Sequence, residues 1–217
     1  SGFPTEAIQF YFDMLEKNIR PDSCTYVSLL HSLCQLEMVN HAINFYRSTA
    51  MRDPDSNSYV HATILCILVR QGRNLIALRI LREAVRENRA LDAVCYTTVL
   101  HGLFQARLVE EARMLFDQMK QLGMASNTCT YNVMLRGLCR TKDIPAVKQL
   151  LTEMEHADVE MDSISFNTIV VFLVKSRLID SAAAMISEML NLGMKPCTKA
   201  SLLLSQSIGY KFVLEDN

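Results

Sequence analysis

The sequence predicts an all-α fold, a right-handed superhelical solenoid of stacked antiparallel helix pairs with repeats of about 35 residues. Three observations lead to this prediction. The 217 residues include only 7 Gly and 5 Pro, while 50% are apolar, which argues against a β-sandwich, a barrel or a disordered chain. Five similar segments recur along the chain at nearly constant spacing, and each carries apolar residues at helical intervals.

An aromatic residue marks the start of each similar segment. These residues are Tyr26, Tyr59, Tyr96, Tyr131 and Phe166. A second apolar run and a turn follow each segment, so one unit contains two helices. A helix pair of this kind cannot bury its own apolar face, and neighbouring pairs must therefore stack on one another.

The units divide the chain in order. Residues 1–22 are predicted to be the second helix of a preceding repeat, because Ala7, Phe10, Tyr11 and Met14 stand at the matching places. Five repeats are then predicted at 23–55, 56–92, 93–127, 128–162 and 163–197. Residues 198–217 are predicted to form a capping helix and tail. The first residue is not Met and the pattern opens within a repeat, which leaves a mature form and a fragment both open.

The fourth repeat shows the first helix most clearly. Its apolar stripe consists of Tyr131, Met134, Leu135, Leu138 and Cys139. The third repeat shows the second helix, with a stripe of Ala112, Leu115, Phe116 and Met119. Pro145 suits the first turn of such a second helix. Gly123 and Gly193 suit the end of one, where a left-handed residue is favoured.

Charge and motifs exclude several function classes. The 22 basic and 23 acidic residues give no general attraction to nucleic acid or to an anionic membrane. No apolar run reaches the length of a membrane span. The 7 cysteines form no Cys-x-x-Cys pair, so buried, reduced thiols are predicted rather than disulfides or a metal site. No catalytic or cofactor motif occurs, and the prediction is a protein without enzymatic activity, metal or cofactor.

Three motifs resemble the pentatricopeptide repeat family. They are Thr-Tyr-Asn-Val-Met-Leu-Arg-Gly-Leu-Cys at 130–139, Glu-Glu-Ala-Arg-Met-Leu-Phe-Asp-Gln-Met at 110–119 and Gly-Met-Lys-Pro at 193–196. The spacing is similar to the pure-repeat class of this family, found in plant organelles. The resemblance implies an adaptor that binds single-stranded RNA, with one base per repeat.

The resemblance also implies which residues read a base, namely the residue after the aromatic and the last residue of the repeat. Thr97 with Asn127 would then favour adenine, and Asn132 with Asp162 would favour uracil. Asn167 pairs with Cys197, which departs from the family pattern and leaves a preference for pyrimidines. The first two repeats would offer Val27 with Asp55 and Val60 with Asp92, and valine cannot hydrogen-bond to a base edge.

Two further roles follow from the resemblance. The residue two places before the aromatic would pack against the base faces. These residues are Cys24, Asn57, Val94, Cys129 and Ile164. Cations near the end of the first helix would contact phosphate, and these are Arg70, Arg140 and Lys175.

The predicted function is therefore sequence-specific binding of an organellar transcript in RNA processing, splicing, stability or translation. A mitochondrial location is predicted, with the chloroplast as the alternative. A second reading is a protein-interaction scaffold, either part of an organellar ribosome or a homodimer. The valines in the first two repeats and the neutral charge favour this reading. The sequence leaves the target transcript open.

Overall fold

The computed structural model describes residues 4–124 and 127–215, with side chains up to residue 206. All secondary structure in these residues is helical, as predicted. The chain forms two compact units, Ser1–Ala125 and Ser126–Asn217, which are described separately. None of the described helices is long and apolar enough to cross a membrane.

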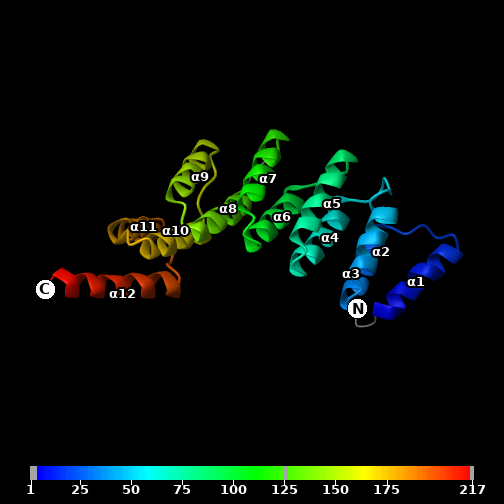
Figure 1. The fold of residues 1–217 in the computed structure, drawn as a ribbon, viewed down its shortest axis with the longest axis horizontal. Coiled ribbons are helices and arrows are strands. Elements are labelled where there is room, and N and C mark those ends of the chain that lie inside the picture. The colour runs from blue at the N-terminus through cyan, green and yellow to red at the C-terminus, as the bar shows by residue number, and fades with distance from the viewer. Residues whose placement is uncertain (1–3, 125–126, 216–217) are drawn as a thin grey trace. The chain divides into compact units, whose positions relative to one another are not determined.

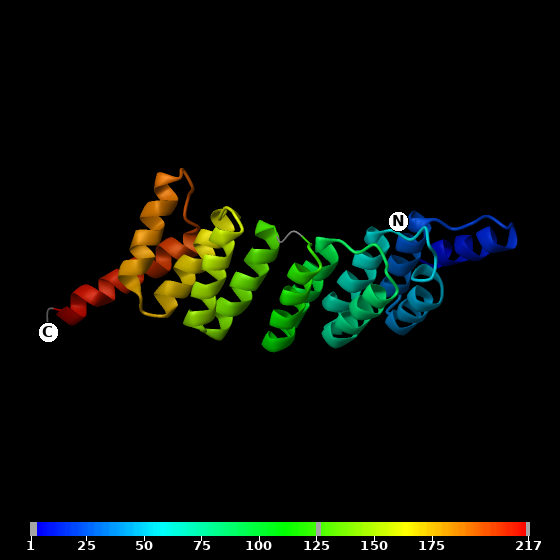
Figure 2. The same ribbon diagram turned by 90° about the horizontal axis from the view of Figure 1, so that it is seen from above.

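The first unit stacks its helices in pairs (Figure 1). Helices α2, α4 and α6 contact one another in sequence, and α1 contacts α2. Each of these three first helices packs against the helix that follows it, and short connections join the members of a pair (Figure 2). Helix α3 continues as a π-helical turn, η1. The bounds are α1 Pro4–Glu16, α2 Ser23–Gln35, α3 Val39–Phe45, η1 Tyr46–Ala50, α4 Ser58–Arg70, α5 Asn74–Arg86, α6 Ala93–Gln105 and α7 Val109–Gln121.

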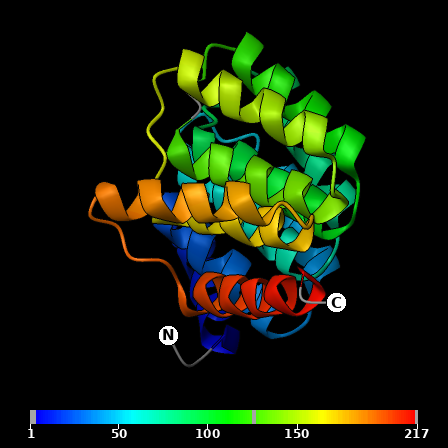
Figure 3. The same cartoon turned by 90° about the vertical axis from the view of Figure 1, so that its left-hand side faces the viewer.

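The second unit has the same construction. Its first helices α8, α10 and α12 contact one another in sequence, while α9 and α11 pack against α8 and α10 respectively. Helices α10, α11 and α12 pack together at the C-terminal end (Figure 3). The bounds are α8 Thr128–Thr141, α9 Ile144–His156, α10 Ser163–Lys175, α11 Ile179–Asn191 and α12 Thr198–Glu215.

Each first helix from α2 to α10 begins at a capped residue. The capping side chain accepts a hydrogen bond from a backbone N–H in the first turn, which satisfies a donor that has no partner within the helix. The caps are Asp22, Asn57, Asp92, Asn127 and Asp162. Helix α9 has Pro145 in its first turn, as predicted, and Asp143 as its cap.

A left-handed residue follows the end of each α-helix from α1 to α11 except α3, and none follows η1, in which α3 continues. Gly123 and Gly193 have φ values of +67° and +72°, which confirms their predicted place. Glycine adopts this conformation without a steric penalty. Non-glycine residues hold the same conformation elsewhere, at Asn18, Glu37, Asn88, Arg107, Lys142, Asp158 and Arg177.

The predicted apolar stripes form the cores. Leu135 and Leu138 are buried in the second unit, and Leu115 and Met119 are buried in the first. One residue of the predicted stripe in 1–22 is different, because Phe10 is 66% exposed. Helix α1 packs against α2 and contacts Phe45 of α3 through Tyr11, and no described helix covers the face of α1 on which Phe10 lies.

The prediction of buried cysteines is wrong for most of them. Cys95 is the buried thiol among the seven, all of which are free. Cys24 and Cys129 are exposed because they occupy the second residue of α2 and of α8, on a face that no described helix covers. Cys197 is also exposed.

The second repeat is shifted by two residues from the predicted register. Helix α4 begins at Ser58, so His61 is its fourth residue, as Tyr26, Tyr96, Tyr131 and Phe166 are in their helices. His61 is fully buried, while Tyr59 is 63% exposed. Tyr59 is therefore not the core aromatic of this repeat.

The shift makes the caps evenly spaced. Asn57 follows Asp22 by 57 − 22 = 35 residues, and Asp92 follows Asn57 by 92 − 57 = 35. We propose that the first two repeats are 23–57 and 58–92 instead of 23–55 and 56–92.

Candidate nucleic-acid interface

The candidate interface follows the first turns of the first helices. The fifth residue of each helix and the residue that caps the next helix are the two positions to which the sequence assigns base reading. With the corrected register, Val27 stands with Asn57, and Ala62, not Val60, stands with Asp92. Val60 is fully buried as the third residue of α4. Neither Val27 nor Ala62 carries a polar side-chain atom, so the first two repeats have no hydrogen-bonding group at this position.

Asn132 and Asp162, to which the family resemblance assigns one base-reading pair, lie in contact. The amide nitrogen of Asn132 donates to both carboxylate oxygens of Asp162, at 3.0 and 3.1 Å. The Ser165 hydroxyl donates to the amide oxygen of Asn132 at 2.6 Å. These three contacts fix the side chain of Asn132 in one orientation, in which it is 8% exposed.

Asp162 is held in its charged form by the same group of residues. Burial is the largest single influence and raises the pKa of the Asp162 carboxyl. The hydrogen bonds from the Ser165 backbone, the Asn132 amide, the Ser165 hydroxyl and the Ile164 backbone together outweigh burial and lower this pKa below its ordinary value. The Asp162 carboxylate is therefore negatively charged at neutral pH.

Asn167 also contacts the position that the sequence pairs with it. The backbone N–H of Cys197 donates to the amide oxygen of Asn167 at 2.7 Å, and the amide nitrogen donates to the Ser163 carbonyl at 2.6 Å. The thiol of Cys197 takes no part in these bonds. The side chain of Asn167 is thus held by backbone groups of this repeat and not by the side chain of Cys197.

The pair of Thr97 and Asn127 spans the two units. Thr97 lies in α6, and its hydroxyl donates to the Ala93 carbonyl at 2.7 Å. Asn127 caps α8 and accepts from the backbone and the hydroxyl of Thr130. Because the two units are described separately, this pair stays a prediction.

The residues predicted to pack against bases lie on the exposed face of the first turn. Val94 is 58% exposed and Ile164 is 49% exposed, so both side chains are accessible to a ligand. Cys129 is exposed at the equivalent place in α8. In α4 the equivalent residue is Tyr59, and Asn57, predicted for this role, is the helix cap instead.

Tyr59 is a functional candidate that the sequence pattern aligned with the aromatic residues of the other repeats. An exposed phenol ring at this place offers a larger stacking surface than valine or cysteine. The even spacing of capping Asp and Asn residues is the signal in the sequence that would have revealed it.

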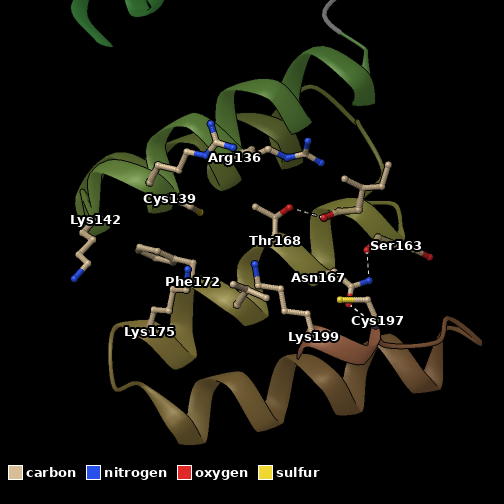
Figure 4. Close-up of a pocket in the computed structure, with 13 residues that line it drawn as sticks. Arg136, Cys139, Lys142, Ser163, Asn167, Thr168, Phe172, Lys175, Cys197 and Lys199 are labelled. Atoms are coloured by element: carbon tan, nitrogen blue, oxygen red, sulfur yellow. Dashed lines mark hydrogen bonds between the residues drawn. The ribbon is translucent and has the colours of Figure 1, made fainter. Parts of the chain in front are cut away.

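The predicted phosphate contacts share one structural position. Arg70, Arg140 and Lys175 are each the thirteenth residue of a first helix, and all three are exposed. Arg140 and Lys175 line a cavity of about 660 Å³ in the second unit, together with Ile164 and Asn167 (Figure 4). The second unit therefore brings a predicted base-reading residue, a packing residue and two cations to one place.

Three cations of this cavity were not predicted from the sequence. Arg136, Lys142 and Lys199 also line it. They are distributed over α8, its C-terminal turn and α12, and no local motif in the sequence connects them. The described residues contain no cluster of His, Cys, Asp and Glu suited to a metal ion.

Family models match more than half of the chain. One, described as the PPR repeat family, matches residues 91–140 and 126–170. Another, described as a PPR repeat, matches residues 24–48 and 164–194.

Curated relatives include two chloroplastic pentatricopeptide repeat-containing proteins of Arabidopsis thaliana. They are 24% identical over 130 residues and 26% identical over 136 residues. Each match covers 60% of this chain but only 15% or 16% of the relative, so the chain spans about a sixth of their length.

Solved structures show the same fold. The pentatricopeptide repeat protein PPR10 in complex with an 18-nucleotide psaJ RNA element matches 97% of this chain and 30% of its own, with 28% identity and a TM-score of 0.67. The PPR domain of Arabidopsis thaliana protein-only RNase P 1 in complex with tRNA has 13% identity and a TM-score of 0.66. It covers 83% of this chain and 95% of its own and supports the fold alone.

Proposed function

Because this chain belongs to the pentatricopeptide repeat family, we propose that it binds single-stranded RNA in a sequence-specific manner, one base per repeat, along the first turns of its first helices. The observation that carries this proposal is the contact between Asn132 and Asp162. Two side chains from successive repeats meet where the family resemblance places base reading. The likeness to an RNA-bound structure at 28% identity supports the same function.

The proposal assigns bases to the second half of the chain. Asn132 with Asp162 favours uracil, Thr97 with Asn127 favours adenine, and Asn167 favours a pyrimidine. Since Val27 and Ala62 offer no hydrogen bond, the first two repeats hold their bases by packing alone, with Tyr59 as the strongest contact. The RNA is therefore selected by its bases at one end and held without selection at the other.

The affinity that this arrangement provides is modest. Base stacking is worth roughly 1–3 kcal/mol for each base. Two or three reading repeats then supply about 2–9 kcal/mol, and micromolar binding corresponds to about 8 kcal/mol. We propose that the chain acts as an adaptor without catalytic activity of its own, which occludes or remodels a segment of a transcript.

The site of action is organellar. The two curated relatives are chloroplastic proteins, which favours the chloroplast over the mitochondrion for this chain. RNA processing, splicing, stability and translation are all served by occlusion of a single strand.

The test is a comparison of short RNAs. RNAs with an adenine–uracil step in either polarity are titrated against a scrambled RNA, with the wild type and with a Thr97→Ala/Asn132→Ala variant. We expect the wild type to prefer one polarity and the variant to lose most of this preference, by about 5- to 100-fold. Equal binding of both RNAs by both proteins would overturn base reading. Melting curves show whether the variant is folded.

A second candidate function is a protein-interaction scaffold. The apolar residues Val27 and Ala62 at the reading positions favour it for the first unit, as does the exposed apolar face of α1 with Phe10 at 66%. Sedimentation of the purified chain distinguishes a homodimer from a monomer. RNA selectivity that persists in the monomer favours the first proposal.

A further inference from the structure

The cavity of the second unit concentrates positive charge that the composition conceals. Residues 126–217 contain nine Lys and Arg residues and ten Asp and Glu residues, so this part of the chain is nearly neutral. Five of the nine cations line the one cavity of about 660 Å³ in Figure 4. They are Arg136, Arg140, Lys142, Lys175 and Lys199. Among the described residues that line it, none is a carboxylate.

The first unit shows a contrasting arrangement. A smaller cavity of about 340 Å³ near the start of α2 is lined by Arg20 and by the carboxylates of Asp22, Asp53 and Asp55. Arg20 forms ion pairs with Asp53 and Asp55 at 2.9 and 2.8 Å. The cation of that cavity is neutralised by the protein, whereas the cavity of the second unit presents five cations to an external anion.

Lys199 is the residue that most clearly changes the pattern of the repeat. It is the second residue of α12, and the second residues of the other first helices are Cys24, Tyr59, Val94, Cys129 and Ile164. All of these are uncharged and are placed to pack against a base. A lysine ammonium is strongly hydrated and makes a point-charge contact with phosphate, so it is poorly suited to the face of a base.

Helix α12 also lacks the other features of a base-reading helix. Its fourth residue is Ser201, where the preceding helices have an aromatic or His61, and its fifth residue is Leu202, which is 53% exposed. The base-reading series therefore ends at Asn167. The positive end of the α12 dipole lies beside Lys199 and strengthens the attraction of this position for an anion.

We propose that this cavity is a phosphate clamp that holds consecutive phosphates of the single strand next to the base at Asn167, with Lys199 as its chain-specific contact. The proposal rests on the proposed function, because it takes the RNA backbone as the source of the phosphates. Arg136 and Arg140 present planar guanidinium groups, which bind phosphate oxygens in pairs. Helix α12 thus holds the backbone where the preceding helices hold bases.

The clamp explains how a chain with 22 basic and 23 acidic residues binds RNA. Phosphate contacts contribute affinity without sequence information. The clamp supplies that affinity at the same end of the chain where Asn132 and Asn167 supply selectivity. The two contributions are separable by experiment because only one of them depends on salt.

The test compares Lys199→Gln with Lys195→Gln. Both lysines are exposed and lie four residues apart, but Lys195 does not line the cavity. The dissociation constant of a preferred and of a scrambled RNA is measured over a range of salt concentrations. For single strands each neutralised phosphate contributes about 0.7 to the slope of log affinity against log salt.

We expect Lys199→Gln to weaken binding of both RNAs by the same factor and to make the slope shallower by about 0.7. Lys195→Gln should leave affinity and slope unchanged. Equal effects of the two substitutions, or an unchanged slope in Lys199→Gln, would overturn the clamp. A change in base preference without a change in slope would also overturn it, because Lys199 would then act on a base.

Two further arms separate the clamp from base reading and from free phosphate. An oligonucleotide backbone without bases should compete with RNA for the wild type and compete less well for Lys199→Gln. Uridine monophosphate or inorganic phosphate that competes equally well at the same phosphate concentration would overturn a clamp for consecutive phosphates. A wild type with no base preference but a normal Lys199 effect contradicts the proposed base reading and leaves the clamp standing.

Discussion

The amide nitrogen of Asn132 lies 3.0 and 3.1 Å from the two carboxylate oxygens of Asp162, across 30 residues of sequence. Asp162 also caps α10, and the Ser165 hydroxyl joins the two side chains. The orientation of Asn132 is thus set before any ligand binds, which reduces the entropy that binding must overcome.

The first prediction concerns this network. Ser165→Ala removes the donor to the Asn132 oxygen and leaves that buried acceptor unpaired. We expect the free energy of unfolding to fall by about 1–3 kcal/mol and the preference for uracil to weaken. Urea denaturation and RNA titration measure the two effects. Ser187→Ala on the exposed side of α11 is the control, and it should change stability by less than about 0.5 kcal/mol. Equal denaturation midpoints in the two variants would contradict the prediction.

The second prediction concerns Tyr59. Tyr59→Ala removes an exposed ring that stacks on a base in the proposed complex. We expect RNA affinity to fall by about 5- to 150-fold for every base at this position, because stacking is worth roughly 1–3 kcal/mol and tolerates all bases. Leu75→Ala is the control, since Leu75 is 59% exposed but belongs to the second helix α5. If Leu75→Ala weakens binding as much as Tyr59→Ala, the loss does not come from stacking.

The third prediction concerns pH. His61 is fully buried, and its Nδ1 is 2.7 Å from the Tyr46 hydroxyl. Burial is the largest influence, nearby Arg89 acts in the same direction and Asp92 opposes them, and together they lower the pKa of His61 to about 4. Between pH 6.5 and about 4 the unfolded chain therefore binds more protons than the folded chain.

The contribution of His61 to stability should accordingly be constant above pH 6.5 and fall by about 3 kcal/mol as the pH drops towards 4. His61→Phe should remove this part of the pH dependence. The check is urea denaturation at several pH values, with exposed His156→Gln as the control. A pH profile that is the same in the wild type and in His61→Phe would rule out His61 as its source.

The fourth prediction concerns the close approach of α4, α5 and α6 at Gly102. A Cβ at this position would lie 2.6 Å from Asn74 Oδ1 and 2.7 Å from Val69 Cγ2. Gly102→Ala should therefore destabilise the fold by about 1–3 kcal/mol. In a Val69→Ala background, Gly102→Ala should lower the free energy of unfolding by less. A double-mutant cycle measures the difference. Additive effects would show that Val69 is not the obstacle.

The fifth prediction concerns the left-handed residue after α10. Arg177 has a φ of +63°, which is costly for a side chain with a Cβ. Arg177→Gly should raise the free energy of unfolding by up to about 1 kcal/mol, after the entropy of glycine in the unfolded chain is subtracted. Arg177→Ala keeps the strain and should give no gain. A similar gain in the free energy of unfolding from Arg177→Ala would show that removal of the arginine side chain, and not relief of backbone strain, is the cause.

The fold was predictable because it depends on local pattern. The stripe from Tyr131 to Leu138 fixes a helix and its buried face, and Gly123 and Gly193 fix two helix ends. The pattern failed at α4, where Ser58-Tyr59-Val60 resembles Thr25-Tyr26-Val27. A match of residue types does not show which face is buried, and His61 fills the core position because a neutral imidazole can replace a phenol there.

The sequence predicted candidate interface residues only where both members of a pair stand at fixed places in the repeat. Asn132 and Asp162 stand at fixed places in successive repeats, and the structure joins them. Arg136 and Lys199 lie 63 residues apart and meet only through the stacking of α8, α10 and α12. The net charge is a sum over the whole chain, so it does not show where the cations cluster in space.

The capping residues have a consequence for how base preference can evolve. Asn57, Asp92, Asn127 and Asp162 each cap the start of a helix, and each also stands at the second position of a pair to which the family resemblance assigns base reading. A mutation at such a position must preserve a helix start, so selection admits only short side chains with an acceptor oxygen. New preferences are therefore reached mainly through the other member of the pair, where Val27, Ala62, Thr97 and Asn132 already differ.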